Sequence, residues 1–122
     1  MIKLDFKDGK SLHEQIEDGF KNLIINKILA ENEQLPSVRE LSLTLTVNPN
    51  TVQKAYKELE NDGFIYSIKG RGNFVAPVSF TKDSKKINEL YDNLESSIKA
   101  LIYLGEDADK IDEFIKKVKE DM

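Results

Sequence analysis

Residues 48–62 constrain the fold most, because they predict an amphipathic helix whose two ends are both marked. Apolar side chains recur there at the spacing of one buried helical face, at Val52, Ala55, Tyr56 and Leu59. Asn48 is a good N-cap, Pro49 suits the first helical position, and Gly63 supplies the positive φ that often ends a helix. Such a helix must pack its apolar face against other elements of the chain.

The opposite face of this helix carries amide and ammonium groups but no acid. Its members are Asn50, Gln53, Lys54 and Lys57. The acids of the helix gather at its far end, at Glu58, Glu60 and Asp62. An ordinary solvated face is one reading of this pattern. The absence of acid favours DNA, because amides can pair with adenine edges and lysines with guanine or phosphate. We interpret residues 48–62 as a recognition helix.

Two more helices are predicted before the recognition helix. The first begins at a capping box, residues 11–14, carries an apolar stripe and ends near residues 26–29. The second follows Pro36, begins at a second capping box, residues 37–40, and ends near Leu45. Only about three residues then connect it to the recognition helix, which predicts a helix-turn-helix.

The segments around these helices have other patterns. Residues 1–10 are expected to form an extended arm, and residues 31–34 a polar loop. Residues 64–68 are rich in β-formers, and residues 73–76 return after a tip that contains glycine. A hairpin directly after a recognition helix is the layout of a winged helix.

The tip of this hairpin is basic and flexible, with the sequence Lys69-Gly70-Arg71-Gly72. Cations at a hairpin tip often serve only solubility. Here the flanking glycines favour a wing that approaches phosphate or the minor groove. The net charge of the chain is −4, but phosphate binding needs local positive potential rather than a basic chain.

After a connector that includes residues 76–79, two amphipathic helices are expected, separated by Gly105. Their apolar stripe consists of Ile87, Leu90, Tyr91, Leu94, Ile98, Leu101, Ile111, Phe114, Ile115 and Val118. The stripe could be intramolecular core only. Two short helices have little core of their own, so packing against a second copy is the favoured reading.

Composition excludes several kinds of chemistry. The chain has no cysteine, and its one histidine, His13, has no apparent partner cluster, so we expect no metal site, no cofactor and no enzyme activity. No apolar run is long enough to span a membrane, and no signal peptide is evident, so we expect a cytoplasmic protein.

Five segments, taken in order, resemble the GntR family of bacterial transcription regulators. They are residues 35–41 (LPSVREL), 47–52 (VNPNTV), 55–60 (AYKELE), 63–65 (GFI) and 70–75 (GRGNFV). The short two-helix tail resembles the YtrA subfamily. Three positions depart from the family pattern, because Asn26, Asn32 and Thr46 stand where glycine or another small residue is usual.

The resemblance implies a winged-helix homodimer that binds a palindromic operator, usually as a repressor and often of genes for ABC transporters. It assigns Arg39 to DNA contact from the second helix, where the alternative is a solvated arginine paired with Glu40 or a neighbouring acid. It places Asn48, Asn50, Thr51 and Gln53 in the recognition helix, and Gly70 and Gly72 where wing glycines approach DNA.

The predicted fold is therefore mainly α with a small β-hairpin. Residues 1–76 are expected to form a winged-helix DNA-binding domain and residues 77–122 a helical dimerisation tail. The alternative is a winged-helix protein-interaction module without specific DNA binding. We expect the tail to be too short to enclose a ligand pocket, which is typically about 300–1,000 Å³. Any effector would then bind at the dimer interface or between tail and DNA-binding domain.

Overall fold

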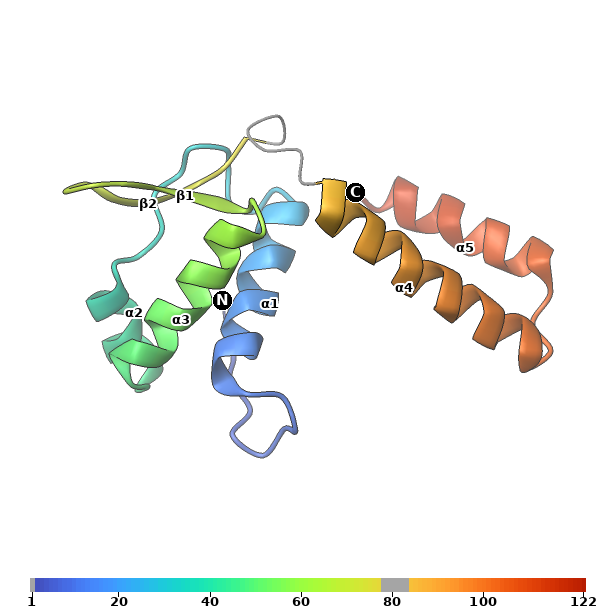
Figure 1. The fold of residues 1–122 in the computed structure, drawn as a ribbon, viewed down its shortest axis with the longest axis horizontal. Helices are drawn as coiled ribbons and strands as arrows, with labels where there is room; N and C mark the ends of the chain where they lie inside the picture. Colours follow the sequence, from blue (N-terminus) through green and yellow to red (C-terminus); the bar gives the residue numbers. More distant parts are fainter. Residues whose placement is uncertain (1, 78–83) are drawn as a thin grey trace. The chain divides into compact units, whose positions relative to one another are not determined.

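The computed structural model describes residues 2–77 and 84–122. The elements are α1 (Leu12–Ile25), α2 (Val38–Leu45), α3 (Pro49–Asn61), β1 (Ile65–Ile68), β2 (Gly72–Val75), α4 (Ser84–Tyr103) and α5 (Ala108–Glu120) (Figure 1). They form two compact units, Met1–Lys82 and Asp83–Met122. The predicted fold class is confirmed, since the described residues form helices and one antiparallel hairpin.

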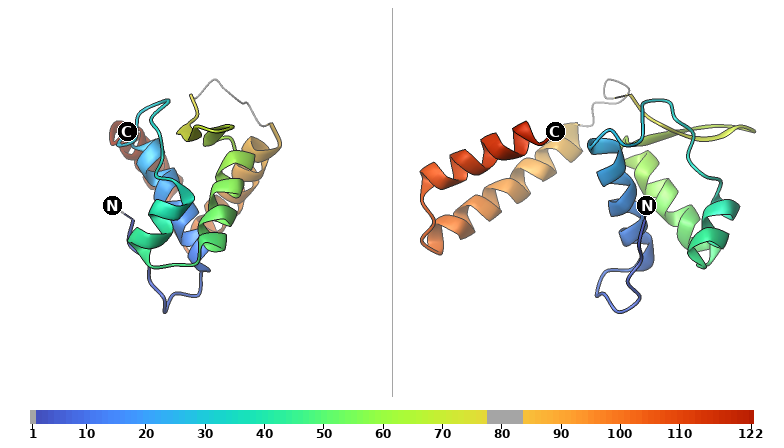
Figure 2. Two further views of the ribbon diagram at one scale, coloured as in Figure 1. Left: turned by 90° about the vertical axis from the view of Figure 1, so that its left-hand side faces the viewer. Right: turned by 180° about the vertical axis from the view of Figure 1, so that it is seen from behind.

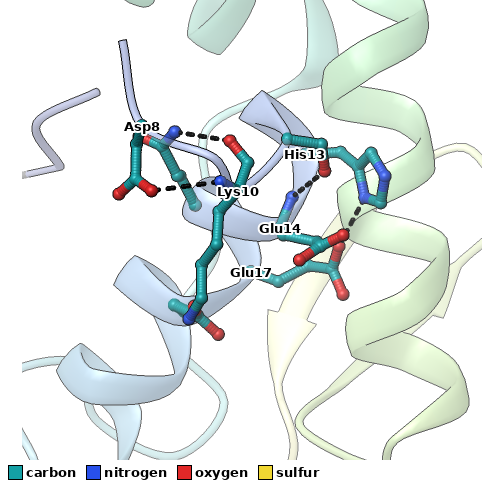
Figure 3. Close-up of polar contacts among 8 residues, drawn as sticks. Asp8, Lys10, His13, Glu14 and Glu17 are labelled. Carbon is teal, nitrogen blue, oxygen red and sulfur yellow. Dashed lines mark hydrogen bonds and ion pairs between the residues drawn. The ribbon is translucent and has the colours of Figure 1, made fainter. Parts of the chain in front are cut away.

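Polar contacts define the start of α1. The Ser11 hydroxyl accepts a hydrogen bond from the Glu14 backbone N–H (3.3 Å), which confirms the predicted cap. In the first turn of the helix, His13 Nδ1 lies 2.8 Å from a carboxylate oxygen of Glu17, one turn further along. The two side chains point toward one another (Figure 3). His13 therefore has a local partner on its own helix. The arm before the helix is tied back as well, because Gln15 donates to the carbonyls of Asp5 and Lys10.

The helix-turn-helix is capped as predicted. The Ser37 hydroxyl accepts from the Glu40 N–H (3.0 Å) and begins α2, and the Asn48 side chain accepts from the Asn50 N–H (2.8 Å) and begins α3. Between the helices, Thr46 takes a left-handed conformation, with φ 56° and ψ 52°. The turn therefore requires a positive φ at this position, which the glycine usual in the family adopts without strain. Threonine adopts it with a strained backbone.

The first unit is built around the apolar face of α3. Val52, Ala55, Tyr56 and Leu59 are all buried, as the spacing predicts. They meet Ile16 and Phe20 of α1, Leu41 of α2, and Ile65 and Val75 of the hairpin. The rings of Phe20 and Tyr56 pack edge to face, with centroids 5.7 Å apart. This core leaves the other face of α3 available to solvent.

The wing has a third pairing segment that the sequence pattern did not predict. The β1–β2 hairpin pairs Ile65 with Val75 and Ile68 with Gly72. On the other edge of β2, the Leu35 N–H donates to the Asn73 carbonyl (2.8 Å) and the Val75 N–H donates to the Glu33 carbonyl (2.9 Å). Residues 31–34 were expected to be a polar loop, and this interpretation is wrong for the part that pairs with β2.

Two asparagines that replace family glycines behave differently. Asn32 has φ 66°, so it fills a left-handed position, which asparagine tolerates. Asn26 has φ −84°, and the left-handed residue of that turn is Lys27, with φ 59°. Only one of the two asparagines is therefore in the left-handed conformation.

The second unit is a pair of antiparallel helices joined by a short turn. Gly105 has φ 93°, and the Asp107 carboxylate accepts from the Asp109 N–H (2.9 Å) to begin α5. Residues 78–79 of the expected connector, and residues 80–83 after them, lie outside the described residues. No helix in the described part of the chain is long and apolar enough to cross a membrane.

Candidate nucleic-acid interface

The outward face of α3 presents the side chains that the sequence singled out. Asn50, Gln53, Lys54 and Lys57 are exposed, whereas Thr51 is half-buried. Asn48 is also exposed, but its side chain is engaged as the N-cap of α3. At the far end of the helix, Asp62 forms an ion pair with Lys21 of α1 (3.1 Å). The exposed half of α3 nearest its N-terminus is thus free of acid.

Arg39 lies in the first turn of α2 and is exposed. Within the described residues its guanidinium forms no ion pair, so the expected alternative of a pair with Glu40 is not observed. The start of α2 is held from α3, because the Tyr56 hydroxyl donates to the Pro36 carbonyl (2.7 Å). Sequence reasoning assigned Tyr56 to the core alone and missed this second contact.

Burial raises the pKa of the Tyr56 hydroxyl above its usual value, and the nearby charge of Glu40 raises it further. The hydroxyl therefore keeps its proton to a higher pH than an ordinary tyrosine does, and over that range it can donate to Pro36. This bond ties α3 to the residue just before the N-cap of α2, three positions before Arg39.

The wing tip is built from a tight turn. The Arg71 N–H donates to the Ile68 carbonyl (2.9 Å), and Gly70 and Gly72 have φ values of 81° and 121°. Such positive φ values favour glycine, which explains both residues. The turn leaves Lys69 and Arg71 exposed.

Two landmarks of the helix-turn-helix and the wing can be located in the ribbon views. The turn between α2 and α3 and the tip of the β1–β2 hairpin project from the same side of the first unit (Figure 1), and a view onto that side shows both (Figure 2, left). The exposed cations on these elements are Arg39, Lys54, Lys57, Lys69 and Arg71. These cations are exposed on a chain of net charge −4, and the exposed acids on the same helices are Glu40 and Glu60.

Comparison with known proteins decides the family. The family model described as bacterial regulatory proteins, gntR family, matches residues 12–75, which spans the helix-turn-helix and the wing. The chain belongs to the GntR family. This confirms the resemblance drawn from the sequence motifs.

Relatives in the GntR family extend the match to the tail. The HTH-type transcriptional repressor YtrA of Bacillus subtilis (strain 168) is 36% identical over 123 residues, which cover 100% of this chain and 95% of that protein. A crystal structure of a transcriptional antiterminator from Listeria monocytogenes EGD-e has a TM-score of 0.83 at 33% identity, covering 98% of this chain and 90% of that one.

A third likeness comes from a structure with DNA bound. AraR(DBD), crystallised in complex with operator ORE1, has a TM-score of 0.54 at 25% identity and covers 62% of this chain and 93% of that one. This chain is therefore a GntR-family transcription regulator with a winged helix-turn-helix DNA-binding domain, and its relatives regulate transcription rather than catalyse reactions. Among the described residues there is no cluster of histidines and acids that could hold a metal ion.

The second unit exposes much of its apolar stripe. Ile98 and Ile111 are half-buried, and the other members predicted for dimerisation are exposed: Ile87, Leu90, Tyr91, Leu94, Leu101, Phe114, Ile115 and Val118. Tyr91 is 66% exposed and Phe114 63% exposed, which is far above what a core aromatic shows. The packing of α4 against α5 therefore covers only part of either stripe.

Two hollows lie on this apolar surface. One, of about 320 Å³, is lined by Leu101, Glu106, Lys110, Ile111 and Phe114, and one of about 250 Å³ by residues of α4 alone. The larger reaches the lower end of the range for small-molecule pockets. The hollow is open to solvent rather than enclosed, so the expectation that the tail is too short to enclose a ligand pocket stays a prediction.

Proposed function

We propose that this regulator is a homodimeric repressor that binds a palindromic operator through two copies of the surface described above. The observation that carries the proposal is the acid-free, exposed face of α3, beside an exposed Arg39 and a basic wing tip. In this arrangement α3 lies in the major groove, where Asn50 and Gln53 reach base edges and Lys54 and Lys57 bind guanine or phosphate.

The remaining DNA-contacting residues have positioning or backbone roles. Asn48 and Thr51 shape the N-terminus of α3, which also suits a phosphate. Lys69 and Arg71 carry the positive charge of the wing, while Gly70 and Gly72 let its backbone approach the minor groove. Residues 1–76 are the DNA-binding domain in this proposal.

The tail, residues 77–122, is the dimerisation element. An apolar stripe that is exposed on both helices is unfavourable in water, and a second copy of the same hairpin would cover it on both subunits. A two-fold dimer also matches the symmetry of a palindromic operator. The hollow beside Phe114 would then lie at or near the dimer interface, where we propose that any effector binds.

The biological setting follows from the family. A regulator of bacterial transcription works in the cytoplasm, where the chromosome lies. Family members of this length often control genes for ABC transporters, and we propose such an operon here. A footprint of the protein on DNA upstream of its own gene tests both the operator and the genes it controls.

A salt titration of DNA binding tests the core of the proposal. Affinity for the footprinted operator, measured by fluorescence anisotropy between about 50 and 200 mM salt, should fall by at least about 100-fold as counterions rebind. Lys57→Ala should reduce the steepness of this fall, because one phosphate contact is lost.

A matched lysine in the second unit provides the control. Lys99 lies on α4, pairs with Glu95 and is well exposed, so Lys99→Ala should leave both affinity and salt dependence unchanged. If binding is absent, or insensitive to salt, the surface does not serve DNA, and the protein-interaction module becomes the better reading.

A further inference from the structure

The side chain of Gln34 makes a contact that the fold itself does not require. Its amide nitrogen donates to the backbone carbonyl of Arg71 at the wing tip (2.8 Å), across 37 positions of sequence. Gln34 is exposed, so its burial contributes little to stability. The acceptor belongs to one of the two cationic residues of the wing.

The position of this bond follows from the ladder along β2. The segment before α2 is bonded to β2 at Glu33–Val75 and at Leu35–Asn73, two residues apart on each chain. The next bond in this register would join the N–H of residue 37 to the carbonyl of Arg71. Ser37 is instead the N-cap of α2, because the chain turns at Pro36. The amide of Gln34 supplies the donor that the backbone ladder no longer provides.

Gly72 makes room for this contact. A Cβ at Gly72 would lie 2.9 Å from the Gln34 amide nitrogen, closer than real Cβ contacts allow. The glycine at this position therefore serves two needs, its φ of 121° and the approach of the Gln34 side chain. Any larger residue at 72 would have to displace the amide.

We propose that Gln34 is a positioning residue for the wing, which fixes the Arg71–Gly72 peptide so that Arg71 is presented to DNA in one orientation. The inference rests on the proposed DNA contact of the wing. A two-stranded hairpin with no third strand beside it is only marginally ordered in water. Ordering it before binding removes an entropic cost that DNA binding would otherwise have to meet.

The test uses Gln34→Met, which keeps the length of the side chain and removes the donor without adding charge. Affinity for the footprinted operator should fall roughly two- to tenfold, the range that one net hydrogen bond supports. In an Arg71→Ala background the same substitution should change affinity by less than about twofold, because its effect passes through Arg71. In the free protein, the ¹⁵N order parameter of the Gly72 amide should fall while those of the α3 amides stay unchanged.

Tyr66→Phe is the matched control. It removes a hydrogen bond from the Tyr66 hydroxyl to Asn32 (2.8 Å), which joins the same two segments at the base of the hairpin rather than its tip. Operator affinity and the Gly72 order parameter should both be unaffected by it.

The outcomes separate this inference from the function on which it rests. If Arg71→Ala weakens binding but Gln34→Met does not, the wing contacts DNA and the positioning role is overturned. Additive losses in the double variant overturn it too, because Gln34 would then act on DNA by itself. If Arg71→Ala has no effect, the proposed wing contact fails, and the positioning role fails with it.

Discussion

Thr46 is the residue at which the helix-turn-helix is most strained. It is a β-branched residue at φ 56°, a conformation in which the Cβ of an L-residue crowds the following carbonyl. Its N–H still donates to the Ser42 carbonyl and ends α2, so the hydrogen bonding of the turn is complete. The short connection forces this conformation, because the chain must change direction between Leu45 and Asn48.

Replacing Thr46 by glycine should stabilise the protein. Relief of left-handed strain is worth about 1–2 kcal/mol, and the extra freedom of glycine in the unfolded chain costs about 0.5–1 kcal/mol. The free energy of unfolding, measured by urea denaturation, should therefore rise by roughly 0.5–1 kcal/mol. Thr44→Gly, in the last turn of α2, should instead lower it by roughly 0.3 kcal/mol, the difference between the helix propensities of the two residues. A loss of stability on Thr46→Gly would show that the turn is not strained.

Tyr56 gives the fold a sensitivity to high pH. Because the pKa of its hydroxyl is raised in the folded state, the unfolded state loses this proton first, near pH 10. Its contribution to stability is therefore complete below about pH 10 and is lost as the pH rises toward the folded-state pKa. Unfolding free energy should fall more steeply above pH 10 in the natural protein than in Tyr56→Phe, as urea denaturation at several pH values would show. Parallel curves would contradict this prediction.

At the scale of elements, the sequence pattern predicted correctly those features that depend on residues close together in the chain. The caps at Ser11, Ser37 and Asn48 and the buried face of α3 depend on neighbours within one or two helical turns, and each formed as expected. The pairing of Glu33 and Leu35 with β2 depends on residues about 40 positions away. Because the segment is polar, its composition does not predict a strand pairing. The contact between Gln34 and the Arg71 carbonyl was missed for the same reason, since no local sequence pattern predicts it.

The recognition helix is the element whose proposed roles can be separated. Gln53→Ala should lower operator affinity by about 1–3 kcal/mol and relax preference at one base position, if the amide makes a bidentate contact with adenine. Lys57→Ala should weaken operator and random DNA alike. Binding to a panel of single-base operator variants measures both effects. Glu60→Ala, exposed at the far end of α3, is the control and should retain the same preference. Equal losses of Gln53→Ala on operator and random DNA would show that Gln53 does not read bases.

At the scale of the whole molecule, the proposed dimer converts two weak contacts into one strong one. A single winged helix on a chain of net charge −4 has modest affinity for DNA. Two such units, linked through their tails, meet half-sites about one helical turn apart, and the second contact becomes intramolecular. Specific repression in this proposal therefore depends on the stripe of α4 and α5 as much as on α3.

A charge within the stripe should separate dimerisation from DNA contact. Leu94 lies near the middle of α4 and is 47% exposed, so the tail of a single subunit should still fold with aspartate at this position. In the dimer, however, Leu94→Asp would place an unpaired carboxylate inside the interface. Sedimentation should show a monomer at micromolar concentration. Affinity for the full operator should fall by at least about 100-fold, while binding to an isolated half-site stays the same.

Lys99→Asp, on the polar side of α4, adds a carboxylate at the same tail without entering the stripe, and this variant should remain a dimer. If the natural protein is itself monomeric at micromolar concentration, the tail does not dimerise the chain. If Leu94→Asp remains dimeric, the subunits meet elsewhere. If Leu94→Asp is a monomer that keeps full operator affinity, the tail does form the dimer, but dimerisation does not contribute to operator affinity. Binding at one half-site would then not strengthen binding at the other.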